Sequence, residues 1–437
     1  MKKTGESYTS ARRHILQQGE SPLPPRAAQS HFAGSVPGAA ALRILLAHSG
    51  VRFENRPLSE AMTFGIAGAI GIGVFQFHYE RENFSSFFLS GRHSWHDDLP
   101  YLRAALDTFG FGCRVLESGG KKAADKNLRD ALAGGAPCVA FVDFASLPHR
   151  AAPDQMRGGG YHVVTVYAID KENESAWIGD STDRPIAIAL SDLTESRLRI
   201  KKFKSRVLTL ETGAEPELRQ LQPRELEHLV RAGLERCIAQ LESPVMQSGR
   251  KNFRLEAISD WASRLHGSDG KDAWQRVFAP GPNLWRGLVS IYETIELYGT
   301  GGGLCRYHMA DFLEEAGQAL ESPALAELSE RYRALGSSWS DLARAALPAG
   351  TAEFDEARSL LDKKSELLHD GPDPEPVRET WAALHELELR AGGSFPISKS
   401  DAEELCRVLK THATAIHLEV VAAIEDIRNL LARKEGL

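Results

Sequence analysis

The spacing of apolar residues predicts a mixed first half of the chain and a helical second half. Residues 39–50, AAALRILLAHSG, repeat apolar positions at helical spacing and end in glycine, which is typical of the position after a helix. Later runs are short, rich in Val, Ile and aromatic residues, and separated by polar turns. These runs are APCVAFVDF (136–144), YHVVTVYAID (161–170), SAWIGDS (175–181) and PIAIAL (185–190). They predict neighbouring strands of an antiparallel sheet, and a helix followed by a sheet is an α+β order.

Strand patterns almost disappear after a polar, proline-containing connector at residues 212–223. Apolar periodicity then predicts helices over 224–241, 252–265, 283–298, 309–320, 323–346, 352–368, 376–389 and about 402–433, the last opened by a cap at Ser400. We therefore expect a first domain over 29–212 and an all-helical domain over 223–437. Residues 1–28 mix polar residues and prolines, and predict a loose arm over the first domain.

Composition and charge exclude several classes of protein. The chain has 437 residues, of which 42% are hydrophobic and 25% charged, which is enough to bury two cores. Its net charge of -7 arises from mixed charges, so we expect neither a nucleic-acid nor a membrane partner. The cysteines are far apart and form no CxxC pair, which predicts neither disulfides nor a zinc site: Cys113, Cys138, Cys237, Cys305 and Cys406. The N-terminal segment does not have the pattern of a secretory signal, so the expected compartment is the cytoplasm.

Two distant segments carry residues that can form a catalytic site. HFAGSVPGAAALR (31–43) predicts a loop entering a helix, with Ser35 suited to cap it and Pro37 suited to its first turn. His162 is predicted to open one strand and Asp180 to close the next, and a turn near Asp170 lets them face each other. A histidine oriented by a carboxylate is a common general base. The same residue types also occur as a strand-end histidine and a capped turn without any catalytic role.

These segments, with PLSEAMTFGIAGAIGIGVF (57–75) and WIGDS (177–181), resemble the N-terminal domain of the butirosin biosynthesis protein H family. The resemblance implies a papain-like, cysteine-peptidase-like fold and transfer of an acyl group from an acyl carrier protein to an amine. It implies that His162 is the general base and Asp180 its orienting carboxylate. His31 matches the family's histidine six residues before the nucleophile, where papain-like enzymes place an oxyanion-stabilising group. The nucleophilic cysteine position falls on Pro37, and the histidine that precedes it in the family falls on Val36.

Proline at the nucleophile position changes the chemistry that this chain can perform. Pro37 cannot attack a thioester, and it lacks the backbone N–H that the nucleophile residue contributes to an oxyanion hole. A covalent acyl-enzyme at this position is therefore excluded, and Ser35 is expected to cap the helix instead of replacing the thiol. Three hypotheses stay open. His162 acts as general base for direct attack of an amine on a bound thioester, or the cleft only binds, or His31, His162 and Asp180 hold a metal.

Two further segments mimic ligand sites but predict none. GIAGAIGIGVFQF (65–77) has neither the GxGxxG order between a strand and a helix nor a Walker lysine, so it indicates close backbone packing. RHSWHDD (92–98) contains His93, His96, Asp97 and Asp98, but its polar flanks indicate a turn that caps a helix over 99–109. No metal and no cofactor is predicted.

A glycine cluster interrupts IYETIELYGTGGGLCRYHMADFLEEAGQAL (291–320), which predicts a sharp turn between two helices. The pattern IExxGTGGGxxR resembles the helical domain of unknown function that often follows the butirosin-H-like domain, so the resemblance spans about 29–348. It implies an ion-paired element facing the cleft. The substrate-binding candidates are Glu296, Gly301, Gly302, Arg306, Asp311 and Glu315. Cys305 is a candidate substitute nucleophile, although a small core residue is the simpler interpretation.

The leading hypothesis is an amide-forming acyltransferase of natural-product biosynthesis with a non-covalent, general-base mechanism. Its partners would be an acyl carrier protein or small thioester donor and an amine acceptor. One alternative is an inactive homologue that acts as a binding or scaffold protein, and another is a thioester or amide hydrolase. The last helices, beyond about residue 349, resemble nothing familiar and leave a homodimer possible.

Overall fold

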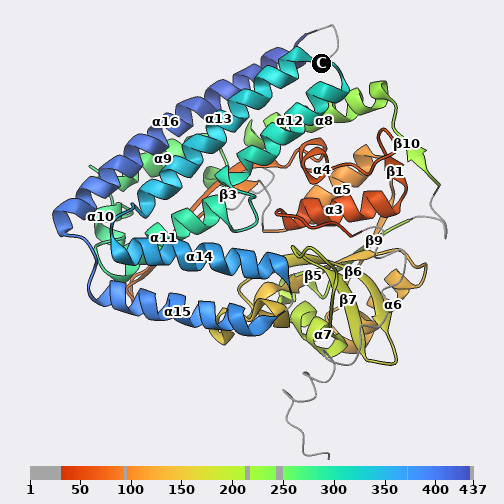
Figure 1. Cartoon of the computed structure of the whole chain (residues 1–437), viewed down its shortest axis with the longest axis horizontal. Helices are drawn as coiled ribbons and strands as arrows, with labels where there is room; N and C mark the ends of the chain where they lie inside the picture. The colour runs from red at the N-terminus through yellow and green to blue at the C-terminus, as the bar shows by residue number, and fades with distance from the viewer. Residues whose placement is uncertain (1–30, 93–95, 212–216, 243–249, 372, 434–437) are drawn as a thin grey trace, which may run out of the picture.

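The computed structural model describes residues 31–92, 96–211, 217–242, 250–371 and 373–433. The structure is α+β, as predicted, with a sheet region from the first half of the chain and a helical region from the second (Figure 1). The predicted arm at 1–28 and residues 212–216 of the predicted connector lie outside the described residues. No helix in the described ranges combines the length and the apolar character needed to cross a bilayer.

A six-stranded antiparallel sheet forms the lower part of the molecule in Figure 1. Its strands, in spatial order, are β4 (Cys113–Leu116), β9 (Val207–Leu210), β5 (Cys138–Asp143), β6 (Tyr161–Asp170), β7 (Ser175–Gly179) and β8 (Ile186–Ala189). The four predicted strands are therefore confirmed as neighbours. Helices α6 (Lys121–Leu132) and α7 (Leu190–Arg199) pack against Val164, Val166 and Ile178 on one face. Helix α3 (Pro37–His48) covers Tyr167 and Trp177 on the other face.

The start of α3 differs from the prediction, because Ser35 does not cap it. The N-cap residue is Val36, which makes no side-chain cap bond. Instead, the backbone N–H groups of Ser35 and Val36 donate to the carboxylate of Glu60, at 3.0 Å and 2.8 Å. Glu60 is the first residue of α4 (Glu60–Ile66). A carboxylate from a neighbouring helix thus takes the place of the local hydroxyl, which is favourable at the positive end of a helix.

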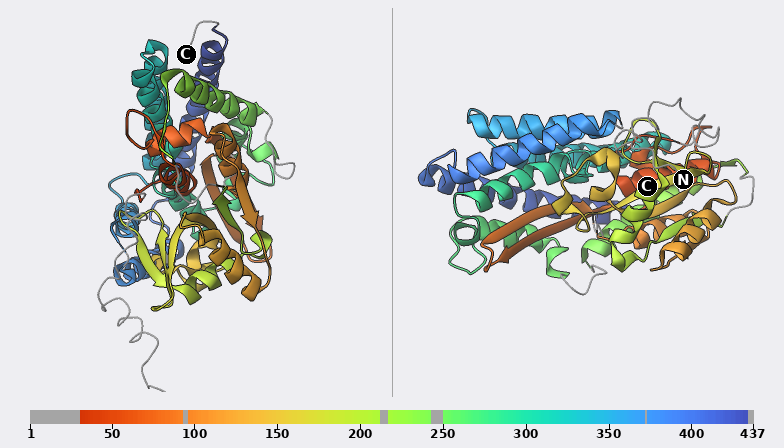
Figure 2. Two further views of the ribbon diagram at one scale, coloured as in Figure 1. Left: turned by 90° about the vertical axis from the view of Figure 1, so that its right-hand side faces the viewer. Right: turned by 90° about the horizontal axis from the view of Figure 1, so that it is seen from below.

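A long hairpin, β2 (Ile70–Tyr79) and β3 (Phe84–Arg92), was not predicted. It extends away from the sheet along the helices (Figure 2). Its glycine-rich start does provide close packing, as predicted. A Cβ atom on Gly65, just before the hairpin, would lie 2.0 Å from the ring of Phe312. The glycines interrupt the alternation of apolar and polar residues from which a strand is predicted.

The helical region confirms the predicted helices, with boundaries that differ by a few residues. Its helices are α8 (Pro223–Glu242), α9 (Glu256–Leu265), α10 (Trp274–Val277), α11 (Pro282–Glu296), α12 (Arg306–Ala319), α13 (Pro323–Ala346), α14 (Ala352–Asp370), α15 (Pro374–Gly393) and α16 (Lys399–Leu431). The cap predicted at Ser400 is wrong. Ser398 caps α16 by accepting a bond from the Asp401 N–H at 3.1 Å, so Ser400 lies within the first turn.

One continuous core joins the helices to the first part of the chain. It contains apolar residues of α3, α4, β2 and β3 as well as those of α11, α12, α13 and α16. The structure also contains α5 (Leu99–Thr108) and a short parallel pair, β1 (Val51–Arg52) and β10 (Arg219–Gln220). Helix α3 is therefore packed between this core and the sheet, and its first residue lies where the sheet region and the helical region meet.

Candidate active site

His162 and Asp180 lie at one end of the sheet and contact each other. His162 is the second residue of β6, and Asp180 directly follows β7. Thr165 of β6 pairs with Gly179 of β7. In this register, Asp180 and His162 are diagonal neighbours on the same face of the sheet. The Nε2 atom of His162 is 2.7 Å from Oδ1 of Asp180, and the two residues are 8% and 6% exposed. The predicted facing arrangement is confirmed as geometry, and the catalytic roles stay a prediction.

Sequence reasoning missed two residues that bind the same carboxylate. A short 3₁₀ helix, η2 (Pro148–Arg150), places His149 Nε2 at 2.8 Å from Oδ2 of Asp180. Arg150 donates from Nε to Oδ2 at 2.9 Å and from Nη2 to Oδ1 at 2.7 Å. A signal for these residues did exist. Because β5 pairs antiparallel with β6, the chain leaving β5 after Asp143 emerges at the end of the sheet where His162 begins its strand.

The contacts of this cluster determine which nitrogen of His162 carries the proton. Its Nε2 lies 2.7 Å from Asp180 Oδ1 and 3.0 Å from Arg150 Nη2. Burial alone would raise the pKa of Asp180, but the Arg150 cation and bonds from both histidines hold it well below its usual range. An ionised carboxylate only accepts, and Asp180 Oδ1 is the closer of the two partners, so Nε2 carries a hydrogen and donates to Asp180. Arg150 Nη2 donates to the same Oδ1 at 2.7 Å, so its approach to Nε2 is a contact between two donors and not a hydrogen bond. The proton-free nitrogen of neutral His162 is therefore Nδ1.

His162 favours its neutral form. Burial lowers the pKa of His162, and the Arg150 cation lowers it further, against the attraction of Asp180. Among the described residues, the two close polar contacts of the His162 ring, with Asp180 Oδ1 and Arg150 Nη2, both involve Nε2. A neutral imidazole with one nitrogen held and the other proton-free has the arrangement of a general base.

Pro37 lies next to this pair. A cavity of about 10 Å³ between α3 and the sheet is bordered by Pro37, Thr165, Gly179 and Asp180, among others. The turn after α11 packs against Pro37 from the helical side, since a Cβ atom on Gly299 would lie 3.3 Å from Cδ of Pro37. The structure thus brings the expected nucleophile position and the carboxylate that orients the expected base to one cavity.

His31 is held by two partners of its own. Its Nε2 is 2.9 Å from the carbonyl oxygen of Thr182, and its Nδ1 is 2.8 Å from the hydroxyl of Tyr167. The carbonyl can only accept, so Nε2 donates to it and Nδ1 accepts from Tyr167. Burial lowers the pKa of His31, in keeping with a neutral ring. His31 therefore joins β6 to the residues after Asp180, and its expected role at an oxyanion stays a prediction.

Helices α14 and α15, which resembled nothing in the sequence, support the segments that carry the site. They lie side by side with one end at the sheet (Figure 1). His369 Nδ1 is 2.9 Å from the carbonyl oxygen of Ser181, directly after Asp180. The indole N–H of Trp381 donates to the carbonyl oxygen of Arg150 at 3.2 Å. The Lys364 ammonium lies 4.0 Å from the centre of the Trp381 ring, which it helps to hold.

Replacing Trp381 by phenylalanine should loosen the Arg150 segment. The change removes one hydrogen bond, which corresponds to about 1 kcal/mol of the free energy of unfolding. Urea unfolding measures that loss, and NMR signals of the His162 ring report movement at the site. Trp339→Phe is the control, because its indole N–H has no partner among the described residues; Trp339 is fully buried, whereas Trp381 is half-buried. Equal displacement of the His162 signals in both variants would contradict a specific role for Trp381.

The glycine turn confirms one prediction and corrects another. Every residue from Gly301 to Cys305 has a positive φ, between 52° and 83°, which explains the glycines. The expected ion-paired element does not form in the described part of the chain. Arg306 is 2% exposed and donates to the carbonyl oxygens of Leu304 at 2.6 Å and Gly71 at 2.9 Å. Buried backbone carbonyl oxygens require hydrogen-bond donors, and the Arg306 guanidinium is the donor to these two.

The other residues expected in the ion-paired element contact different partners. Asp311 pairs with Arg333 at 3.1 Å, and Glu315 accepts a bond from the Ser59 hydroxyl at 2.6 Å. Glu296 lies against Gly302, where a Cβ atom would be 3.3 Å from its Oε2. Their role in substrate binding, with that of Gly301 and Arg306, stays a prediction.

Cys305 does not replace the missing nucleophile. It is fully buried, and burial raises the pKa of its thiol to about 11. At neutral pH the side chain is therefore the unreactive thiol. The simpler interpretation, a small core residue, is confirmed.

The segment before α5 has structural partners. His93 lies outside the described residues. Asp97 accepts a bond from the Leu99 N–H at 3.0 Å, which confirms the predicted cap, and Asp98 pairs with Arg92 at 2.7 Å. Within the described ranges, no group of three or more His, Cys, Asp or Glu side chains is arranged to hold a metal ion.

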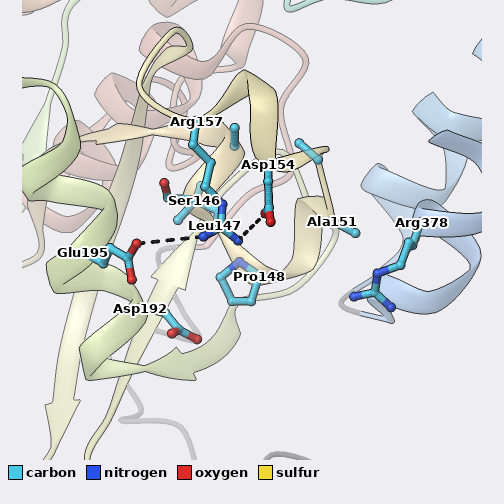
Figure 3. A pocket seen from close by; sticks show the side chains of 11 residues that line it. Ser146, Leu147, Pro148, Ala151, Asp154, Arg157, Asp192, Glu195 and Arg378 are labelled. Carbon is cyan, nitrogen blue, oxygen red and sulfur yellow. Dashed lines mark ion pairs between the residues drawn. The ribbon is translucent and has the colours of Figure 1, made fainter. Parts of the chain in front are cut away.

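A larger cavity of about 370 Å³ is bordered by Pro148 of η2 (Figure 3). It is lined by residues of η1 (Phe144–Ser146), η2, η3 (Asp154–Met156), α7 and α15. Arg157 crosses it to pair with Asp154 at 3.0 Å and Glu195 at 3.9 Å. The cavity is lined by neither His162 nor Asp180, so it is separate from the pair.

Comparison with known proteins gives two family matches. Residues 37–181 match the family described as butirosin biosynthesis protein H, N-terminal, and residues 217–375 match a domain of unknown function, DUF4872. No curated protein matches the chain. The two matches together support a family like butirosin biosynthesis protein H, and the first suggests an enzyme like those of butirosin biosynthesis. The first match contains the positions of Pro37, His162 and Asp180.

Proposed function

We propose that this protein is an amide-forming acyltransferase of natural-product biosynthesis that works without an acyl-enzyme. The observation that carries the proposal is the 2.7 Å contact between His162 Nε2 and Asp180 Oδ1, which leaves Nδ1 of a neutral His162 free to take a proton, together with Pro37, which shares a cavity with Asp180 and cannot act as nucleophile. A papain-like fold for the sheet region belongs to the same proposal. The match to the butirosin H family supports both.

In this mechanism the amine of the acceptor attacks the carbonyl carbon of a bound thioester directly. The new C–N bond forms as His162 Nδ1 takes the proton from the amine nitrogen. The C–S bond then breaks, and the thiolate leaves with the proton that His162 returns. Asp180 stabilises the imidazolium while it exists. The products are an amide and a free thiol.

The test is product analysis with the full chain, acyl carrier protein thioesters and a panel of amines. Mass spectrometry should find the amide and the free carrier thiol, and the protein mass should not increase by an acyl group. Free carboxylic acid in place of amide would indicate a hydrolase that uses the same pair. A covalently acylated protein would overturn the non-covalent mechanism.

A binding or scaffold protein is the second candidate, and one observation favours it. The cavity at Pro37 is about 10 Å³, which holds no more than one water molecule, and Gly299 packs against Pro37 itself. For catalysis, the turn at Gly299 has to move to admit a thioester. Tight binding of carrier protein with neither amide nor acid formed would support this candidate.

A further inference from the structure

Arg150 occupies an unusual place for a cation, because it faces a histidine expected to accept a proton. We infer that Arg150 is a positioning residue that keeps His162 neutral and proton-free at Nδ1. A thiolate nucleophile would instead stabilise a protonated histidine. The inference rests on the proposed function for its purpose. Neither the predicted site residues nor the family matches assign Arg150 any role.

The geometry fixes both the carboxylate and the ring. Arg150 binds Asp180 side-on, with Nε on one carboxylate oxygen and Nη2 on the other. Such a two-point contact sets the plane of the carboxylate, which in turn orients the His162 ring. The Arg150 side chain is 13% exposed, so water screens its charge little. Its Nη2 is also 3.0 Å from His162 Nε2.

The balance of charge explains the effect on His162. The groups that face it are Asp180 after β7 and His149 and Arg150 of η2, while Tyr298 of the turn after α11 lies near Arg150. With neutral histidines, the Arg150 and Asp180 charges cancel. Protonation of His162 would leave one net positive charge in a buried cluster. Without Arg150, the same protonation would instead complete an ion pair with Asp180 and become favourable.

A histidine kept neutral is consistent with a proline at position 37. In a thiolate enzyme the negative sulfur stabilises a protonated histidine. Pro37 supplies no anion, so a protonated His162 would have no such partner and could not take a proton from an amine. The cation at position 150 and the proline at position 37 therefore favour the same neutral base.

The test is an NMR pH titration of full-length protein labelled in its histidine rings, with His162→Gln used to assign the signal. In the wild type, His162 should titrate below the pH of a free histidine. In Arg150→Gln, its midpoint should rise by about one unit or more. Arg150→Lys keeps the charge and should stay near the wild type, and it also serves if Arg150→Gln does not fold. An unchanged midpoint in folded Arg150→Gln, or equal midpoints in the Lys and Gln variants, would overturn the inference.

The titration does not depend on turnover, so its failure is distinct from failure of the proposed function. Where turnover is measurable, a second readout is its pH profile. A base works only when unprotonated, so activity falls as the pH drops through the pKa of His162. Raising that pKa in Arg150→Gln should move the loss of activity to higher pH, by the same interval as the NMR midpoint.

Discussion

His162→Gln should lose amide formation by a factor of about 10² to 10⁴, the usual contribution of a general base. Glutamine can still donate a hydrogen bond to Asp180 Oδ1, as His162 Nε2 does at 2.7 Å, so the carboxylate keeps a partner. What disappears is the basic nitrogen that takes the proton from the attacking amine. The measurement is kcat/KM for amide release from a carrier-protein thioester.

The controls separate loss of chemistry from loss of structure. His385→Gln changes an exposed histidine on α15 and should leave both turnover and unfolding unchanged. Binding of the thioester, measured by calorimetry, should persist in His162→Gln. Equal rates of amide formation in wild type and His162→Gln would eliminate His162 as the base.

Local patterns predict the two strands that carry the candidate pair. Alternating apolar residues define β6 and β7, and the polar turn between them places His162 and Asp180 at the same end of the sheet. Their diagonal pairing also depends on a register shift between Val166 and Ala168, which no local pattern predicts. The long helices follow in the same way from their periodicity, and the helix predicted at 323–346 is observed at Pro323–Ala346.

The rest of the site depends on contacts between distant segments. His149 and Arg150 lie in a single 3₁₀ turn, which has no periodic pattern, and only the sheet register places them against Asp180. His369 and Trp381 reach the site because α14 and α15 pack beside it, more than 180 residues away in sequence from their partners. Arg306 was expected in an ion-paired element, but the buried guanidinium donates to backbone carbonyl oxygens.

Replacing Asp180 by asparagine should cost the fold about 3–5 kcal/mol, the usual effect of breaking a buried ion pair from one side. The Asp180 carboxylate is 2% exposed and binds Arg150 at two points. In Asp180→Asn the guanidinium stays buried without a counter-charge. Urea unfolding at neutral pH measures the loss.

The pH dependence of stability provides a second check with a definite sign. Asp180 has a lowered pKa in the folded state, so its contribution is present above the ordinary value of 3.8 and is lost as the pH falls below it. His162 also has a lowered pKa in the folded state. Its contribution to the free energy of unfolding is therefore lost at higher pH, as the pH falls below 6.5. Both slopes make the wild type less stable in acid. Asp180→Asn lacks the first, so its unfolding free energy should vary less below about pH 4.

A double-mutant cycle decides whether Asp180 and Arg150 act as one unit. Each single variant, Asp180→Asn or Arg150→Gln, leaves one buried charge unpaired, whereas the double variant leaves none. The double variant should therefore be much less destabilised than the sum of the two single losses. Additive losses would mean that the two charges do not stabilise each other. In that case Arg150 could not hold Asp180 ionised, and the proton on His162 Nε2 would need another explanation.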